Sequence, residues 1–264
     1  MHNPRVKRLV QLARQRSARD DAKVLIAEGP VLVADAAAAG LVIEEVFVEA
    51  AAAERPEVAA AVEAAVAAGA RAYLLDGSLK GRGAAVTPNG LTAVVGRPSA
   101  PPQGPVRADG DLVMVLVGVA DPGNVGTLIR VAEVCGASRV VATTGSADPW
   151  SPKCVRSSAG SAFRVPIQTG VTAEEVLTEL GAQGYRRFGT RAGVGAGFGD
   201  LRLNGPIALV LGSEAHGLPG DLDHLLDEVI SIPMAGRAES LNVAMAGAIV
   251  GFKAFCDQDS DREA

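Results

Sequence analysis

The stretch "LVMVLVGVADPGNVGTLIRVAEVCG", residues Leu112–Gly136, joins an apolar run to a helix-like repeat through a short polar turn. The run at 112–119 lacks polar alternation, which is typical of a strand buried on both faces. From Asn124 onward, apolar residues recur at helical spacing until Gly136, and glycine commonly follows the last turn of a helix. A buried strand leading directly into a helix predicts an α/β fold with a parallel sheet.

The same alternation continues toward the C-terminus. One intervening helix is expected at "TAEEVLTELGAQG" and a short one at "SPKCVRSSAG", and the closing helix is expected from about Leu241 to Phe255. Further strands are expected at "RVVAT", "RVPIQ", "YRRFGT", "PIALVLG" and "EVISIP". Ligands of parallel α/β sheets bind beyond the carboxyl ends of the strands, so the chemistry is expected in the loops that follow these strands.

A second α/β layer of about four strands precedes this domain, at "KVLIAEG", "IEEVFV", "RAYLL" and "LTAVVG". The segment "RPSAPPQGPVRADG" separates the two layers and is rich in proline and glycine, which indicates a linker. The predicted organisation is a small domain at 1–97, a linker at 98–110 and a larger domain at 111–264.

Composition excludes several classes of protein. Of the 264 residues, 48% are apolar, which suffices for a sizeable core. No apolar run approaches the roughly 18 residues of a membrane helix, and the basic N-terminus lacks the apolar stretch of a secretory signal. Three cysteines without metal-ligand spacing favour a reduced, cytoplasmic protein with neither disulfide nor zinc.

Charge is unevenly distributed along the chain. Residues 1–23 contain seven Lys or Arg against two Asp, whereas the whole chain has a net charge of −5. A basic segment on an acidic body is a footprint of nucleic-acid binding, although a solvated surface helix gives the same pattern. We interpret the segment as a basic arm.

The glycines of "GVGAGFG", Gly193–Gly199, superficially resemble a dinucleotide-binding fingerprint. That fingerprint needs a helix directly after the glycines, to hold the pyrophosphate at its N-terminus. Here "DLRLNGP" follows, which does not predict a helix. A nucleotide-dependent oxidoreductase is therefore disfavoured, and the segment is expected to be a lid or surface loop.

Three separated loops carry polar residues against apolar elements. "DPGNVGTLIR" holds Asn124 and Arg130, "LVLGSEAHGLPGDL" holds Glu214, and "SIPMAGRAESLNVAMAGAIVGF" holds Ser240 and Asn242. Each loop alone has an ordinary interpretation, as a helix cap, a surface charge or a glycine turn. Ser240 is expected to cap the closing helix. The order and spacing of all three together are much more specific.

These loops, together with "DPWSPKCVRSSAGSAFRVP", identify the chain as similar to the SpoU/TrmH branch of the SPOUT RNA methyltransferases. The N-terminal "NPRVKRLVQLARQRSARDDAKVLIAEGPVLVADA" resembles the family's small substrate-binding domain. This resemblance implies methyl transfer from S-adenosyl-L-methionine to a ribose 2′-hydroxyl, on a parallel sheet whose C-terminal segment forms a trefoil knot. It implies no metal.

The resemblance also assigns residues. Cofactor contacts are expected from Gly212, Ile232, Leu241, Thr190, Leu211, Gly217 and Met234. The catalytic group is expected to comprise Arg130, Asn124, Glu214, Ser240 and Asn242. Because an arginine stays protonated, we expect Arg130 to grip a phosphate and stabilise the developing alkoxide, and Glu214 to hold its guanidinium or take up the proton through water. The proton acceptor and the roles of Glu239, His216 and His224 stay open.

RNA contacts are expected from Arg14, Arg16, Arg19, Lys153 and Arg156. The resemblance further implies a homodimer formed through the apolar closing helix. Ribosomal RNA, specifically 23S, is the preferred substrate. The alternatives are a transfer RNA 2′-O-methyltransferase and a non-catalytic RNA-binding or ribosome-assembly factor, and the choice between a housekeeping and an antibiotic-resistance role stays open.

Overall fold

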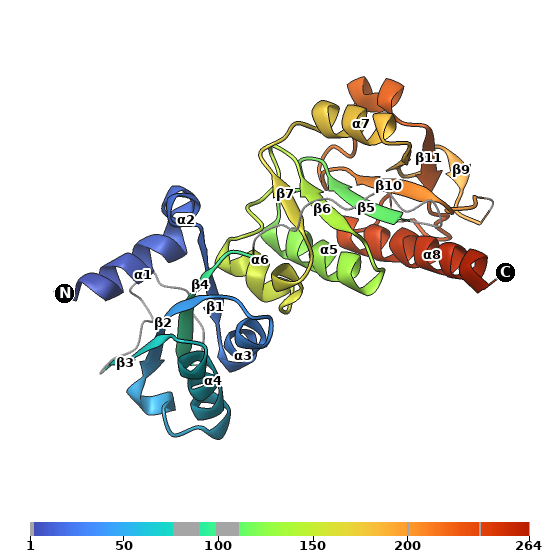
Figure 1. Ribbon diagram of the computed structural model, residues 1–264. Coiled ribbons are helices and arrows are strands. Elements are labelled where there is room, and N and C mark those ends of the chain that lie inside the picture. The colour runs from blue at the N-terminus through green and yellow to red at the C-terminus, as the bar shows by residue number, and fades with distance from the viewer. Residues whose placement is uncertain (1–2, 76–89, 99–110, 200, 238, 264) are drawn as a thin grey trace. The chain divides into compact units, whose positions relative to one another are not determined.

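The computed structural model describes residues 3–75, 90–98, 111–199, 201–237 and 239–263, so most of the predicted linker lies outside the described residues. The chain forms two compact units (Figure 1). The N-terminal unit contains Met1–Ser99 and Trp150–Arg164, and the C-terminal unit contains Ala100–Pro149 and Val165–Ala264. The segment 150–164, which we expected in the C-terminal domain, belongs to the N-terminal unit.

The N-terminal unit contains a four-stranded sheet at the four predicted positions, with the order β1-β4-β2-β3. Strand β4 is antiparallel to β1 and β2, whereas β2 and β3 are parallel. The strands are β1 Val24–Glu28, β2 Ile43–Glu49, β3 Arg71–Leu75 and β4 Leu91–Gly96. The helices are α1 Pro4–Arg14, α2 Arg16–Ala22, α3 Pro30–Ala38, α4 Pro56–Ala67 and α6 Pro152–Ser157. Short 3₁₀ turns lie at η1 Ala50–Ala52 and η2 Ser161–Phe163.

Helix α6 packs against β1, which places the 150–164 segment in this unit. The buried ring of Trp150 lies 5.4 Å from the guanidinium carbon of Arg97, at the end of β4. Arg97 also donates to the Val24 carbonyl at 3.0 Å and to Asp20 at 2.7 Å. These contacts involve residues distant in sequence, which explains why sequence pattern placed the segment in the other domain.

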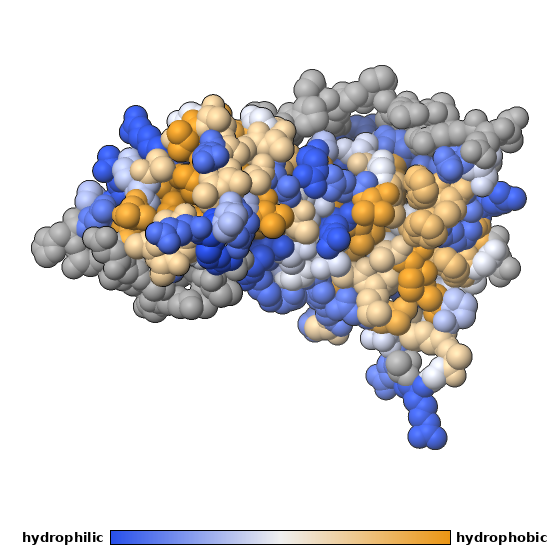
Figure 2. All heavy atoms as spheres, turned by 90° about the horizontal axis from the view of Figure 1, so that it is seen from below, coloured by the Kyte–Doolittle hydropathy of each residue, from blue (hydrophilic) through white to orange (hydrophobic). Residues whose placement is uncertain are grey.

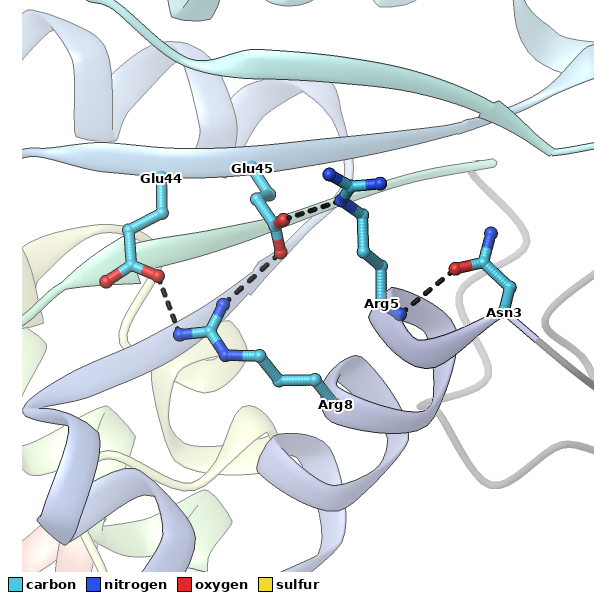
Figure 3. Close-up of polar contacts among 5 residues, drawn as sticks. All are labelled: Asn3, Arg5, Arg8, Glu44 and Glu45. Atoms are coloured by element: carbon cyan, nitrogen blue, oxygen red, sulfur yellow. Dashed lines mark hydrogen bonds and ion pairs between the residues drawn. The ribbon is translucent and has the colours of Figure 1, made fainter.

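The basic N-terminal segment is not a free arm, which corrects our interpretation. Helix α1 is amphipathic and buries Val6, Leu9 and Leu12 in the core of the sheet. Its outer arginines are turned toward carboxylates of β2 (Figure 3). Arg8 donates to Glu44 at 2.7 Å and to Glu45 at 3.2 Å, and Arg5 pairs with Glu45 at 3.5 Å. Part of the positive charge is thus neutralised within the unit.

The C-terminal unit contains a seven-stranded sheet in which every neighbouring pair is parallel, with the order β7-β6-β5-β10-β8-β11-β9. All six predicted strands are present, and only the two-residue β9, within the glycine loop, was not expected. The strands are β5 Asp111–Leu116, β6 Arg139–Ala142, β7 Ile167–Thr169, β8 Arg186–Thr190, β9 Ala196–Gly197, β10 Pro206–Leu211 and β11 Glu228–Ser231.

Helices cover both faces of this sheet (Figure 1). They are α5 Pro122–Val134, α7 Ala173–Ala182 and α8 Val243–Glu263, with a 3₁₀ segment η3 at Gly220–Leu225. Helices α5 and α8 pack together on one face, while α7 and η3 lie on the other. The glycines of α8 allow this close packing, because a Cβ at Gly247 would lie 2.3 Å from the Leu128 side chain. None of the helices in the described residues is both long and apolar enough to cross a bilayer.

Candidate active site

Polar side chains from three loops meet beyond the carboxyl edge of the C-terminal sheet. Helix α5 starts just after β5, and Asp121 is its N-cap, accepting a hydrogen bond from the Asn124 backbone N–H at 3.0 Å. Asn124 is therefore not the cap but lies in the first turn, which leaves its side-chain amide available to the site. That amide donates to Glu214 Oε1 at 2.6 Å. The other carboxylate oxygen accepts from the Ala120 N–H at 3.4 Å.

Asn242 extends this series of hydrogen bonds to a third loop. Its Nδ2 donates to Asn124 Oδ1 at 3.1 Å. Its Oδ1 accepts from the backbone N–H groups of Ala244 at 2.9 Å and Met245 at 3.4 Å. Asn242 is therefore the N-cap of α8, and the predicted capping role of Ser240 is wrong. The helix begins two residues later than expected for the same reason.

A pocket of about 440 Å³ lies beside these residues. Its volume falls in the range of small-molecule sites. Six of the seven predicted cofactor residues line it, namely Thr190, Gly212, Gly217, Ile232, Met234 and Leu241. Leu211 does not line it, since that side chain is fully buried and lies on the Gly247 side, toward α8. Glu214, Ser240 and the unassigned Glu239 and His216 also contribute to the wall.

The glycine turn after β10 is tightly packed. Ser213 and Gly217 exchange backbone hydrogen bonds of 3.1 and 2.9 Å, and Gly217 has a φ of +66°. A Cβ at Gly212 would lie 2.3 Å from the carbonyl carbon of Gly217 and 2.4 Å from the Leu218 nitrogen. Glycine is thus required at 212 because backbone passes directly across it.

Arg191 is a residue of the pocket wall that sequence reasoning missed. It follows β8 directly, so its place just beyond a predicted strand end was the available signal. Its Nη1 donates to Asp223 at 3.1 Å and its Nη2 to the Leu218 carbonyl at 3.4 Å. The hydrogen bond from Arg191 lowers the pKa of Asp223. Arg191 thereby ties the end of β8 to both the glycine turn and η3.

Arg130 lies on α5, six residues after Asn124, and is exposed. It forms no hydrogen bond or ion pair with the part of the chain that the structure describes. The expectation that Glu214 holds its guanidinium is therefore not met, because both oxygens of Glu214 accept from Asn124 and Ala120 instead. The Arg130 charge is left available to an external anion.

The predicted RNA contacts lie in the N-terminal unit and differ in exposure. Arg14, Arg16 and Lys153 are exposed, and Arg16 lies 3.4 Å from Asp20. Arg19 is buried and donates to the carbonyls of Leu12 at 2.7 Å and Ala13 at 3.3 Å. The prediction that Arg19 contacts RNA is therefore wrong, since its guanidinium covers the last turn of α1.

Taken together, the fold and site define an α/β protein with a ligand pocket beyond a parallel sheet and a polar cluster from three loops beside it. Among the described residues, no group of three or more His, Cys, Asp or Glu side chains is arranged to hold a metal ion. Residues 111–252 match the SpoU rRNA Methylase family, and residues 3–79 match the MRM3-like substrate binding domain. The chain belongs to the SpoU rRNA Methylase family.

Individual relatives cover the chain to different extents. It is 37% identical over 138 residues to the 23S rRNA (guanosine(2553)-2′-O)-methyltransferase RlmP of Bacillus subtilis, a match covering 52% of this chain and 55% of that protein. The chain thus spans about half the length of this relative. An uncharacterized tRNA/rRNA methyltransferase of Synechocystis sp. is 30% identical over 253 residues, covering 96% of this chain and 90% of the relative.

Among solved structures, the AdoMet-bound rRNA methyltransferase from Sinorhizobium meliloti is similar over the whole chain. The TM-score is 0.81 at 30% identity, and the alignment covers 96% of this chain and 95% of that one. The likeness therefore includes both units.

Proposed function

We propose that this protein transfers a methyl group from S-adenosyl-L-methionine to a ribose 2′-hydroxyl of RNA, with 23S ribosomal RNA as the preferred substrate. The observation that carries the proposal is the hydrogen-bonded series Asn242–Asn124–Glu214 at the rim of the pocket. Family membership and the RNA methyltransferase names of the relatives support it.

The pocket suits S-adenosyl-L-methionine in volume and in the chemistry of its lining. The side chains of Ile232, Met234 and Leu241 line it and offer an apolar slot for the adenine. At Gly212, which also lines the pocket, the backbone of Gly217 and Leu218 packs directly against the glycine, so the turn is closed at the pocket wall. When bound, the cofactor supplies an activated methyl on its sulfonium sulfur. The residues of the chain would orient the two reactants, and positioning of this kind supplies much of the rate in a direct transfer.

Charge at the site suits an approaching nucleotide. Arg130 would bind the phosphate next to the target ribose and stabilise the negative charge that develops on the 2′-oxygen. The Glu214 carboxylate, held by Asn124 and the Ala120 N–H, would receive the proton of the 2′-hydroxyl directly or through water. Ser240, at the pocket wall, is left to contact the ribose.

We further propose that the protein acts as a homodimer through α8. This helix exposes a row of large apolar side chains, with Met245 at 59% and Phe252 at 58% exposure, and Ile249 lies between them. Val134 of the adjacent α5 is 68% exposed. Figure 2 looks toward the side on which α5 and α8 lie, and it shows hydrophobic atoms gathered there. Exposed apolar groups of this size typically mark an interface.

A ribosomal substrate, with the reduced cysteines, favours a cytoplasmic location. Two other functions stay open, namely a transfer RNA 2′-O-methyltransferase and a non-catalytic RNA-binding factor. The non-catalytic function is disfavoured because Asn242, Asn124 and Glu214 are all present and hydrogen-bonded in series beside the pocket.

Methylation of defined RNAs tests the proposal. The purified protein would be incubated with methyl-labelled cofactor in two reactions, one containing unmodified 23S ribosomal RNA and the other containing transfer RNA. We expect labelling of 23S RNA at one nucleotide. The 2′-O-methyl group would be mapped by the resistance of the adjacent phosphodiester bond to alkaline hydrolysis. Labelling of transfer RNA alone would identify transfer RNA, not 23S RNA, as the substrate. Binding of both RNAs without transfer of label would indicate the non-catalytic function.

A further inference from the structure

An ion pair in the N-terminal unit joins a buried carboxylate to an exposed cation. Glu28 ends β1, and its side chain is 1% exposed. Arg156 of α6 donates from Nη1 to Glu28 Oε2, yet its own side chain is 45% exposed. The second oxygen, Oε1, is buried and accepts no hydrogen bond from the described residues. The Glu28 carboxylate is thus enclosed, whereas the Arg156 side chain reaches the surface.

Stability does not account for this arrangement. Burial raises the pKa of Glu28, and the charge and hydrogen bond of Arg156 oppose that shift without cancelling it. A carboxyl whose folded-state pKa is raised stabilises the fold below its unfolded pKa, and the contribution is lost as pH rises through the folded pKa. Burial thus disfavours the ionised carboxylate of Glu28 in the folded state. Buried ion pairs are in general weak evidence for stability.

The pair does fix the direction of an exposed guanidinium. A guanidinium carries five N–H donors in one plane. Glu28 Oε2 accepts a hydrogen bond from Nη1 of Arg156, and within the described residues Nη2 and Nε have no partner. One side of the group is therefore anchored and the remaining donors are left for a ligand. Lys153 is exposed on the same short helix, three residues earlier.

We propose that Glu28 is a positioning residue that orients Arg156 to bind an RNA phosphate. This inference rests on the proposed function, since it presumes that the N-terminal unit binds RNA. Two N–H donors in a rigid plane match a phosphate better than a freely rotating cation does. Holding the arginine in advance removes the loss of side-chain freedom that binding would otherwise require.

Glu28→Gln gives a test in which two explanations predict opposite signs. The substitution removes a negative charge, so charge alone predicts tighter binding of RNA. Positioning predicts weaker binding, by about tenfold, because the arginine loses a charged hydrogen bond that fixed it. Filter binding of the full chain to a 23S ribosomal RNA transcript, at several salt concentrations, measures the effect. Arg156→Ala should weaken binding similarly and lower the salt slope by about one.

Matched variants separate positioning from charge and from folding. Glu63→Gln removes the same charge from an exposed site on α4 and should not weaken binding. The double variant of Glu28→Gln and Arg156→Ala should bind like Arg156→Ala alone. Affinity for S-adenosyl-L-methionine, measured by calorimetry, should stay at the parent value in each. Glu28→Asp keeps the charge but retracts the carboxylate, so it should also weaken binding, and it replaces Glu28→Gln if that variant melts below the assay temperature.

Equal or tighter RNA binding by Glu28→Gln overturns the proposal, as does a Glu28→Asp variant that binds like the parent. An Arg156→Ala variant with parent affinity also overturns it. Those results leave the proposed function standing if the parent methylates 23S RNA. Absence of methylation with these RNA effects intact would instead refute only the catalytic assignment.

Discussion

At the scale of single residues, the capping bond of α8 fixes the orientation of two side-chain amides. The Asn242 oxygen must face the helix because only an oxygen accepts from the N–H groups of Ala244 and Met245. Its nitrogen therefore faces the Asn124 oxygen, and the Asn124 nitrogen faces Glu214. Both oxygens of Glu214 thus act as acceptors, one from Asn124 and one from the Ala120 N–H.

The catalytic assignment of Arg130 gives a prediction about rate. Arg130→Ala should lower methyl transfer by about 10²–10³-fold, as expected for loss of one charge stabiliser. Cofactor affinity should stay nearly unchanged, because Arg130 does not line the pocket. Single-turnover methylation at saturating RNA and cofactor is the measurement. Arg130→Lys keeps the charge without the planar fork, so partial rescue would indicate simple electrostatics. A parent rate in the alanine variant would exclude Arg130 from catalysis.

Gly212 gives a prediction about the pocket. In Gly212→Ala, the added Cβ must displace the backbone at Gly217 and Leu218. We expect S-adenosyl-L-methionine affinity to fall at least about tenfold, the equivalent of roughly 1.4 kcal/mol. Calorimetry measures the affinity, and thermal unfolding reports any wider loss. Gly220→Ala is the control, because nothing lies within 4 Å of its added Cβ. Equal affinities in the two variants would contradict the assigned cofactor site.

At the scale of elements, the chain turns sharply between α1 and α2, and Arg19 secures that turn. Gln15 is extended between the two helices, so α1 ends with carbonyls that lack helical partners. The buried Arg19 guanidinium returns from α2 to two of them. A cation at a helix C-terminus is also favoured by the helix dipole.

Arg19→Gln should therefore destabilise the protein by roughly 2 kcal/mol, the loss typical of a charged hydrogen bond. Denaturant unfolding measures this change. Arg16→Gln, one turn earlier and exposed, should change stability by less than about 0.5 kcal/mol while reducing the salt dependence of RNA binding. If Arg19→Gln keeps parent stability and weakens RNA binding, its structural role is refuted. A variant that changes Arg14, Arg16 and Arg19 together would combine the loss of stability with the loss of RNA affinity.

Sequence pattern predicted regular elements well and their ends less well. Apolar runs identified all the strands except β9, which pairs with β11 through only two residues of a glycine loop. The cap of α8 was misplaced because Ser240 and Asn242 are both good caps and lie two residues apart. Arg19 was misjudged because a buried arginine and an exposed one look alike in sequence.

The candidate site was predictable to a similar degree. The three loops were identified from motif order, and six of the seven cofactor residues assigned by the resemblance line the pocket. The hydrogen-bond partners did not follow, because they depend on distances between loops up to 118 residues apart in the chain. The trefoil knot stays a prediction.

At the scale of the whole molecule, the proposed homodimer gives a prediction about the apolar face of α8. Phe252→Asp places a charge in this face and should give a monomer, because a carboxylate in a closed apolar contact is strongly unfavourable. Analytical ultracentrifugation over a range of concentrations measures the mass. Val31→Asp, at a residue 71% exposed on α3, should leave the parent mass unchanged. A parent protein that is monomeric at every concentration would refute the dimer.

The N-terminal unit is discontinuous in sequence, because α6 reaches it from within the region that matches the methyltransferase family. Gene truncation therefore cannot remove this unit cleanly. A fragment ending at residue 99 would lack Trp150, α6 and the arginine that faces Glu28. The remaining fragment would carry a helix evolved to lie on a missing strand. Cutting the N-terminal unit out whole therefore requires cuts at three places in the chain, after Ser99 and on both sides of the 150–164 segment.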